Sequence, residues 1–488
     1  MVAGRATPAT GTPIERTADL RVVIAGAGEV GYHVAGALYR EGVEIAAIDN
    51  DAGVLERLRQ DFNITTFLGT ATDTETLAHA EVGRADLFLA ITNYDETNII
   101  ACLMAAEAGA AKRIARVKSI VFGEGSSVSD RTYLGIDLII NPYEVAAEHL
   151  ANLVTHPQVT DFNQFLDDRV LLVRFPIRED SRLAGATVLE FGQDSRIPNT
   201  LIALIQQNGQ PIIPHAEHRI HAGDRVYFFC EPDRLNALSR YLRLSTAACR
   251  RVFINGGGHI GLAVARRLEN RTPHVRLMEI SEEKCQTLSQ LLNRTLVLNV
   301  DGTDSLSLKA EGIEHADSFI SVTNLDQVNI VSCLLAREYG TPHTIALVKQ
   351  PEYIPILESR KAVSVGFSPR LLTARKLLRF VRGETVQSFF AFPNSDIELL
   401  EMEVTAGARC EERPLVSMEL PVGVLIGAVM RGREIFIPRG QDVLRAGDRV
   451  LLIQQRRHRK VTHELFFGAS PHGSGGVAAA SPAREASQ

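Results

Sequence analysis

The sequence predicts an α/β protein with two Rossmann-like, doubly wound parallel sheets, each followed by a small α+β module. Three observations support this fold class. Short apolar runs alternate with stretches of helical spacing, and a glycine-rich turn follows the first apolar run of each half. The two halves repeat with a period of about 230 residues, which indicates duplication of a whole domain. At 488 residues, the chain has room for several buried cores.

The first half is organised around residues 21–50. An apolar run at 22–25 predicts a buried strand, GAGEVG at 26–31 a glycine turn, and residues 30–40 a helix. A second strand at 44–48 ends at Asp49, where a carboxylate can accept both hydroxyl protons of a ribose. Asp49 favours NAD over NADP, because a 2′-phosphate would face its negative charge.

The glycines of this turn have distinct expected roles. Gly26 allows the tight turn, Gly28 lets a pyrophosphate approach the backbone, and Gly31 lets the helix lie close to the strand. The N–H groups at the helix N-terminus would then face the anion. The predicted cofactor-binding residues of this segment are Gly26, Ala27, Gly28, Glu29, Val30, Gly31 and Asp49.

Further strands are expected at 65–68, 87–91, 113–117 and 138–140. Polar residues follow them where such a sheet binds its ligand, outside the carboxyl ends of the strands. Thr92 and Asn93 follow one strand, and Arg116 ends another, with Lys118 beside it, where a cation could reach a phosphate. Helix capping is the alternative role for Thr92 and Asn93. Thr72 and Asp73 either line an adenine pocket or cap a helix.

The second half repeats these features from Arg251 onward. Gly256, Gly258 and Gly261 reproduce the glycine spacing, and Glu279 follows the third glycine by eighteen positions, as Asp49 does in the first half. These four residues form a second, weaker predicted site. Leu347 aligns with Arg116, so the second site lacks that cation and the first site is expected to bind nucleotide more tightly.

A short module follows each predicted sheet. Strand candidates there are 170–175, 201–206, 211–213 and 225–229 in the first, and 398–404, 423–431 and 434–438 in the second, where Gly447-Asp448-Arg449-Val450 echoes Gly223-Asp224-Arg225-Val226. The expected division is a disordered arm (1–18), a first nucleotide-binding domain (19–157), a small module (158–246), a second nucleotide-binding domain (247–386), a second small module (387–467) and a disordered tail (468–488).

Composition excludes several classes of protein. The net charge of -6 gives no general attraction to nucleic acid. No run of eighteen apolar residues is present and the N-terminus lacks the apolar core of a signal peptide, so we expect a cytosolic protein. The six cysteines include no CxxC pair and are expected to be buried and unpaired.

Two other features have competing interpretations. His215, His218 and His221 could hold a metal, but a partly solvated hairpin is the favoured interpretation, since nothing nearby completes a ligand set. The basic stretches 369–382, expected to be an amphipathic helix, and 456–460 could meet an acidic partner or the inner membrane surface. Solvated faces are favoured for both stretches.

The repeated motifs resemble those of the TrkA family, the cytosolic regulatory subunits of the bacterial Trk potassium-uptake system, whose domains are also called RCK domains. The resemblance covers about 19–467 and rests on GAGEVG with Asp49, GTATD at Gly69, ITN at Ile91 and ARVK at Ala115, repeated as GGGHIG, GTD, VTN and ALVK. It implies binding of NAD(H), with ATP or ADP competing. It also implies a homo-oligomeric ring beneath a membrane-embedded potassium transporter, peripheral on the inner face of the cell membrane.

Catalysis is not expected, because a dehydrogenase needs a substrate domain with a proton donor and a binding cation, and the short modules after each sheet show neither, nor paired carboxylates or a Cys-His arrangement that recurs in both halves. A nucleotide that binds two conformations with different affinity can shift their equilibrium without any reaction. Two alternatives stay open. The chain could be an NAD-dependent oxidoreductase, or a nucleotide sensor that acts on another transporter.

Overall fold

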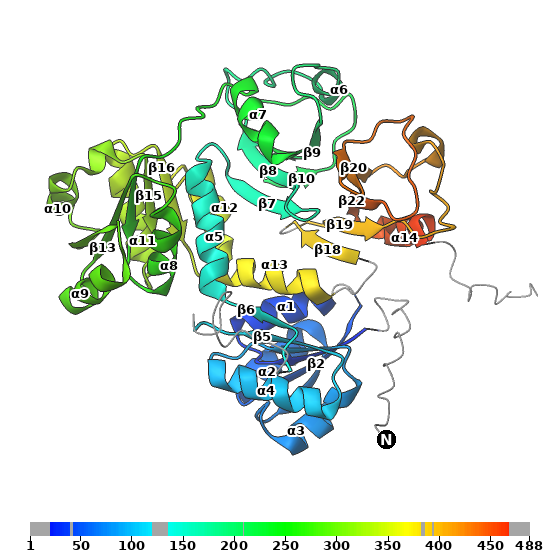
Figure 1. Ribbon diagram of the computed structural model, residues 1–488, viewed down its shortest axis with the longest axis horizontal. Helices are drawn as coiled ribbons and strands as arrows, with labels where there is room; N and C mark the ends of the chain where they lie inside the picture. The colour runs from blue at the N-terminus through cyan, green and yellow to red at the C-terminus, as the bar shows by residue number, and fades with distance from the viewer. Residues whose placement is uncertain are drawn as a thin grey trace, which may run out of the picture.

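The computed structural model of the chain describes residues 20–39, 42–119, 135–207, 209–381, 386–392 and 395–467. These residues form two six-stranded parallel sheets, each followed along the chain by a five-stranded antiparallel sheet (Figure 1). The predicted fold class is therefore confirmed. The arm 1–18 and the tail 468–488, which we expected to be disordered, lie outside the described residues.

The first parallel sheet has the strand order β3-β2-β1-β4-β5-β6. Because successive side chains of a strand point to opposite faces, Val22 and Ile24 join the core on one face while Val23 and Ala25 join the core on the other. The strand order reverses between β1 and β4, so the crevice that such folds use for ligands lies beyond the carboxyl ends of these two strands. The elements are β1 (Arg21–Ala25), α1 (Glu29–Tyr39), β2 (Glu44–Asp49), α2 (Ala52–Phe62), β3 (Thr65–Leu68), α3 (Thr74–His79), β4 (Leu87–Ala90), α4 (Asp95–Ala108), β5 (Lys112–Arg116), β6 (Leu138–Ile140) and α5 (Pro142–Thr155).

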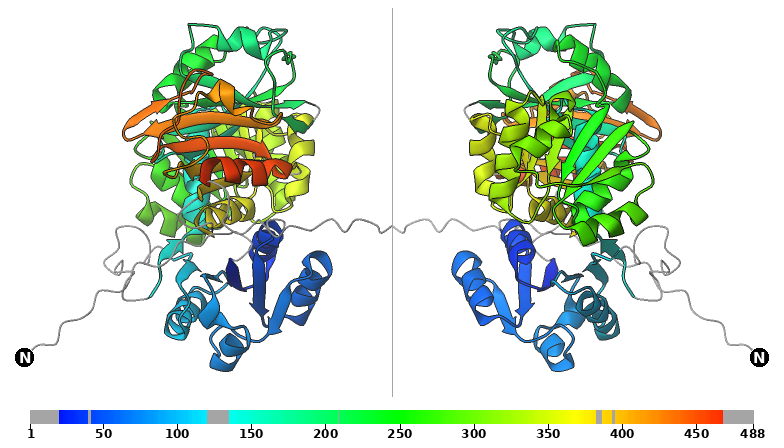
Figure 2. Two further views of the ribbon diagram at one scale, coloured as in Figure 1. Left: turned by 90° about the vertical axis from the view of Figure 1, so that its right-hand side faces the viewer. Right: turned by 90° about the vertical axis from the view of Figure 1, so that its left-hand side faces the viewer.

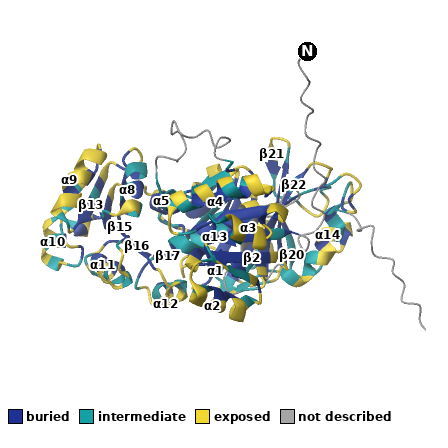
Figure 3. Ribbon diagram, turned by 90° about the horizontal axis from the view of Figure 1, so that it is seen from below, coloured by how far each residue is buried: buried dark blue, intermediate teal, exposed yellow. Residues whose placement is uncertain are grey.

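The second parallel sheet has the equivalent order, β14-β13-β12-β15-β16-β17. Its strands β12, β15 and β16 are buried except for the first residue of β12, and most residues of its helices α9 and α10 are exposed or partly exposed (Figure 3). The elements are β12 (Arg251–Asn255), α8 (His259–Leu268), β13 (His274–Glu279), α9 (Glu282–Leu291), β14 (Leu296–Asn299), α10 (Ser305–Ala310), β15 (Ser318–Ser321), α11 (Asp326–Glu338), β16 (His343–Leu347), α12 (Ile354–Ser359), β17 (Val365–Phe367) and α13 (Pro369–Val381).

The two small modules pack against each other and share one apolar core. Gly427 of the second module lies so close to Phe229 of the first that a Cβ atom at Gly427 would come within 2.2 Å of the ring. Sequence patterns did not predict β7 or β18. The modules contain β7 (Asp161–Phe165), β8 (Val170–Pro176), α6 (Val188–Gly192), β9 (Thr200–Gln207), β10 (Gln210–Ile212), β11 (Arg225–Cys230) and α7 (Leu235–Tyr241), then β18 (Val386–Ala391), β19 (Ile397–Glu403), β20 (Val424–Arg431), β21 (Glu434–Phe436), β22 (Arg449–Gln455) and α14 (Arg459–Phe467).

The two parallel-sheet domains exchange the helix that follows their last strand. α5 follows β6 of the first sheet but packs against α8 of the second, where Ala147 and Leu150 join the second core. α13 follows β17 of the second sheet but packs on α1 of the first, where Leu377 joins the first core (Figures 1 and 2). Each half is thus completed by an element of the other, which couples them through apolar burial.

The basic helix was predicted, but its environment was not. α13 spans Pro369–Val381, so Arg382 of the predicted stretch lies outside the described residues, and Ala374, Leu377 and Leu378 of the helix are buried against the first sheet. On the basic side, Arg370 and Lys376 stay 30% and 40% exposed, so burial of the apolar side does not contradict the expected solvated face. In the other basic stretch, Arg459 pairs with the buried carboxylate of Glu398. A count of charges along the sequence cannot identify such partners, because they lie tens or hundreds of residues away.

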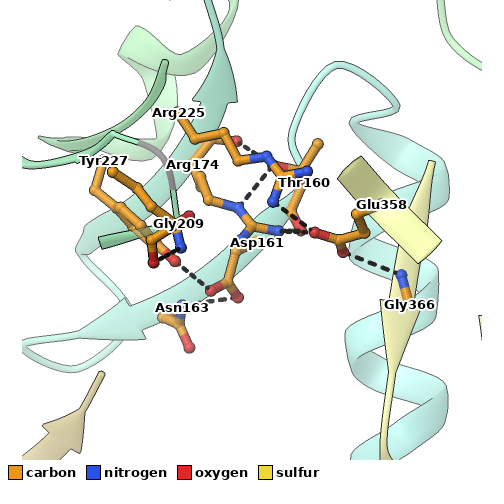
Figure 4. Close-up of polar contacts among 10 residues, drawn as sticks. Thr160, Asp161, Asn163, Arg174, Gly209, Arg225, Tyr227, Glu358 and Gly366 are labelled. Carbon is orange, nitrogen blue, oxygen red and sulfur yellow. Dashed lines mark hydrogen bonds and ion pairs between the residues drawn. The ribbon is translucent and has the colours of Figure 1, made fainter. Parts of the chain in front are cut away.

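A buried carboxylate fixes the first small module to the second parallel-sheet domain (Figure 4). Glu358 of α12, only 3% exposed, pairs with Arg225 Nη1 at 2.9 Å and with Arg174 Nη2 at 3.4 Å. Its other oxygen accepts the N–H of Gly366 in β17 at 3.1 Å. A buried charge is tolerated only when it is paired and hydrogen-bonded. The Glu358 carboxylate therefore keeps its partners only when the first small module docks on the second parallel-sheet domain in this geometry.

Candidate functional site

The glycine turn joins β1 to α1 at the centre of the first sheet. Gly26 follows β1 with φ +104°, and a Cβ atom there would lie 2.6 Å from the Thr92 nitrogen beyond β4. A Cβ atom at Gly31 would lie 2.0 Å from the Gly26 oxygen, so α1 can start here only with glycine at this position. At Gly28 a Cβ atom would meet nothing within 4 Å. The protein itself therefore does not require glycine at 28, whereas a ligand approaching the backbone would.

The acidic residue at the end of β2 is tied to this turn. Asp49 accepts the Ala27 N–H at 2.7 Å on one carboxylate oxygen and the Asp51 N–H at 3.0 Å on the other. These bonds fix the carboxylate beside the turn and leave lone pairs free, because each ionised oxygen can accept two hydrogen bonds. The geometry suits a group that accepts hydroxyl protons from a sugar held over the turn.

Asn98 of α4 holds the ends of β4 and β5 together, a role that we did not assign from the sequence. It is fully buried; its oxygen accepts the Thr92 N–H at 2.8 Å and the Thr92 hydroxyl at 2.7 Å. Its amide donates to the carbonyls of Thr92 and Arg116 at 3.1 and 2.7 Å. The available signal was the recurrence of this asparagine in both halves, at Asn98 and Asn329.

Two cations lie at the same edge of the sheet. Arg116 Nη1 donates to the Thr92 carbonyl at 3.1 Å and to the Asn93 side chain at 3.4 Å, and Lys118 Nζ donates to the Asn93 carbonyl at 2.5 Å. Burial lowers the pKa of both groups, which stay cationic at neutral pH given their high ordinary values. The predicted group Thr92, Asn93 and Arg116 is thus brought together by contacts within the protein.

The other predicted residues of the first half have more local roles. Asp73 caps α3, accepting the Thr76 N–H at 2.8 Å and the Thr76 hydroxyl at 2.6 Å, and the hydroxyl bond lowers the pKa of its carboxyl group. This is the capping alternative. Thr72 lies one residue earlier, with its hydroxyl 3.1 Å from that of Thr70. The side chain of Val30 is buried in the core, so only its backbone faces the turn.

The second half repeats the framework. Gly256 has φ +109°, and a Cβ atom at Gly261 would lie 1.9 Å from the Gly256 oxygen, while Gly258 again has open space. Glu279 accepts the N–H groups of Gly257 and Ser281, both at 3.0 Å, as Asp49 does in the first half. Asn329 makes the same bonds as Asn98: it accepts the Thr323 N–H and donates to the carbonyls of Thr323 and Leu347.

The cation does not recur in the second half. The Leu347 carbonyl accepts the Asn329 amide at 3.0 Å, but the Leu347 side chain is 5% exposed in an apolar core. The second site therefore offers less positive charge to an anion.

Two further sequence features have structural explanations. The rings of His215 and His218 lie edge to face, with centroids 5.6 Å apart. His221 Nδ1 lies 3.8 Å from Asp224 Oδ2. Across the described part of the chain, no group of three or more His, Cys, Asp or Glu side chains could hold a metal. All six cysteines are buried and unpaired, as predicted.

Comparison with known proteins assigns the chain to a family. The model of the TrkA-N domain matches residues 22–142 and 252–368, and that of the TrkA-C domain matches 172–243 and 399–466. The chain belongs to the TrkA family. The resemblance seen in the repeated motifs is thereby confirmed.

TrkA relatives match over nearly their whole length. The Trk system potassium uptake protein TrkA of Halomonas elongata is 32% identical over 455 residues, covering 92% of this chain and 99% of the relative. The TrkA homolog 1 of Methanosarcina mazei is 30% identical over 456 residues, covering 92% and 100%. Among solved structures, the GsuK RCK domain (TM-score 0.57, 20% identity, 95% and 98% coverage) and the GsuK channel bound to NAD (0.58, 20%, 95% and 81%) share the fold.

Proposed function

We propose that this TrkA protein is the nucleotide-binding regulatory subunit of a Trk potassium-uptake system. It binds NAD(H) at the first glycine turn, with ATP or ADP competing, and gates a membrane-embedded potassium transporter. It acts by binding and not by catalysis, as expected for a TrkA protein. None of its described helices is long and apolar enough to cross a bilayer, so the transport path would belong to its partner.

One observation carries the binding proposal: a glycine turn with open space at Gly28 lies beside a fixed carboxylate at Asp49. The N-terminus of α1 supplies unpaired N–H groups for a phosphate, and Asp49 supplies acceptors for a ribose. Thr92, Asn93 and Arg116 complete the predicted contacts, with Thr72 and Asp73 beyond β3. Gly256, Gly258, Gly261 and Glu279 form the second site, which binds more weakly.

Assembly into a homo-oligomeric ring is part of the proposal. α4 and α11 occupy equivalent places in the two halves and expose apolar side chains at matching positions. Ile100 and Leu103 are 46% and 38% exposed, and their counterparts Val331 and Leu334 are 45% and 43% exposed. Apolar faces repeated in both halves suit contacts between copies of one chain, placed under the transporter on the inner face of the membrane.

The test is potassium flux through the reconstituted transporter with this protein, with and without NADH, ATP or ADP. Nucleotide-dependent flux that is lost in Asp49→Ala supports the proposal. Flux that ignores nucleotide, or purified protein that binds no adenine nucleotide in calorimetry, would overturn it. Oxidation of bound NADH by any member of a carbonyl panel would favour the oxidoreductase alternative.

A further inference from the structure

The first glycine turn is in contact with a cation from the other half of the chain. Glu29, the first residue of α1, forms an ion pair with Arg370, the second residue of α13, 341 positions away. This contact exists because α13 packs on α1 in the exchanged arrangement. Glu29 is 58% and Arg370 30% exposed, so solvent and a ligand can reach both side chains.

The ion pair lies where a phosphate would bind. The N-terminus of α1 attracts anions, but the Glu29 carboxylate at that terminus repels a phosphate and competes with it for any cation nearby. Arg116 lies at the same turn: its Nη1 donates to the Thr92 carbonyl at 3.1 Å, and the Thr92 nitrogen lies 2.6 Å from the position of a Cβ atom at Gly26. Two guanidinium groups, one from each half, therefore converge on the first turn.

The second glycine turn lacks this arrangement. His259 stands where Glu29 stands in the first half, and Tyr143 of α5 stands where Arg370 stands. These two rings stack with centroids 4.8 Å apart and planes 12° apart. With Leu347 in place of Arg116, the second turn lacks the counterparts of both arginines, and both differences disfavour a phosphate there.

We propose that Arg370 is a phosphate-binding residue of the first site, supplied by the second half of the chain. Without nucleotide it pairs with Glu29, and with nucleotide its guanidinium turns to the phosphates, where a bidentate contact is available. α13 begins two residues after the end of β17. When Arg370 exchanges Glu29 for a phosphate, the resulting shift of α13 is therefore transmitted to the second parallel-sheet domain. The inference rests on the proposed function, because it requires a nucleotide at the first turn.

The experiment compares ADP with adenosine, which lacks phosphate, in calorimetric titrations of the full chain. Arg370→Met is expected to raise the Kd for ADP about tenfold to a hundredfold and to leave the Kd for adenosine unchanged. Lys376→Met is the matched control: it removes a cation of the same helix that lies 4.0 Å from Glu148 of α5. It should bind ADP as the parent does.

A second variant tests the competition. Glu29→Gln is expected to lower the Kd for ADP severalfold, because the carboxylate no longer competes for Arg370. Parental ADP affinity in Arg370→Met, or equal weakening of ADP and adenosine, overturns the inference and leaves the proposed function standing. A parent protein that binds neither compound overturns both.

Discussion

Arg116→Leu gives the first nucleotide site the side chain that the second site has at this position. The guanidinium donates to Thr92 and Asn93, and its Nε atom is buried with no partner among the described residues. A charge-assisted hydrogen bond to a phosphate contributes about 1.5–3 kcal/mol, so its loss should raise the Kd for NADH about tenfold to 150-fold.

The fold should tolerate this substitution. The Thr92 carbonyl that loses the Arg116 bond still accepts the Asn98 amide at 3.1 Å, so no buried acceptor is left unpaired. The reverse change, Leu347→Arg, is not a clean test, because it would bury a charge in the apolar core around Leu347.

The assay is a calorimetric titration with NADH, fitted to two sites, on the parent and on Arg116→Leu. Lys112→Leu is the control, since it removes an exposed cation from the opposite end of the same strand, β5. In Arg116→Leu only, we expect the Kd of the tighter site to rise to that of the weaker site. Equal affinities in parent and variant would refute the reasoning.

Three other predictions concern stability and the turn. Glu358→Ala should lower the free energy of unfolding by about 3–5 kcal/mol, because Arg174 and Arg225 lose their buried partner; an unchanged urea midpoint would contradict this. Burial lowers the pKa of His343 to about 4 from 6.5, so the unfolded state binds more protons between these values. The contribution of His343 to stability is then nearly complete above pH 6.5 and about 2 kcal/mol lower at pH 5, and His343→Asn should make the profile in thermal unfolding less steep, with the part due to His149, whose pKa burial also lowers to about 4, remaining. Gly31→Ala should abolish NADH binding and lower the unfolding temperature, since its Cβ would overlap the Gly26 oxygen; parental binding would disprove the steric reasoning.

Local patterns in the sequence determined the two parallel sheets and their glycine turns. β3 and β6 have the predicted bounds, and most of the other predicted strands agree to within a residue or two, because each is a short run rich in apolar residues that is bounded by turn residues. β7, with the sequence DFNQF, was missed because it alternates weakly and is only partly buried. Asp49 was placed at the turn by spacing alone, since a strand and a helix of fixed rise leave little freedom over eighteen residues.

Tertiary structure alone decided which elements complete each site. The exchange of α5 and α13 brings Arg370 to Glu29, and docking of the first small module brings Arg174 and Arg225 to Glu358. Each of these ion pairs joins residues more than 130 positions apart, and a charged residue has the same local pattern whether its partner is water or a distant carboxylate. Hydrophobic spacing fixes the face that a helix buries, but it does not specify which of two similar domains receives that face.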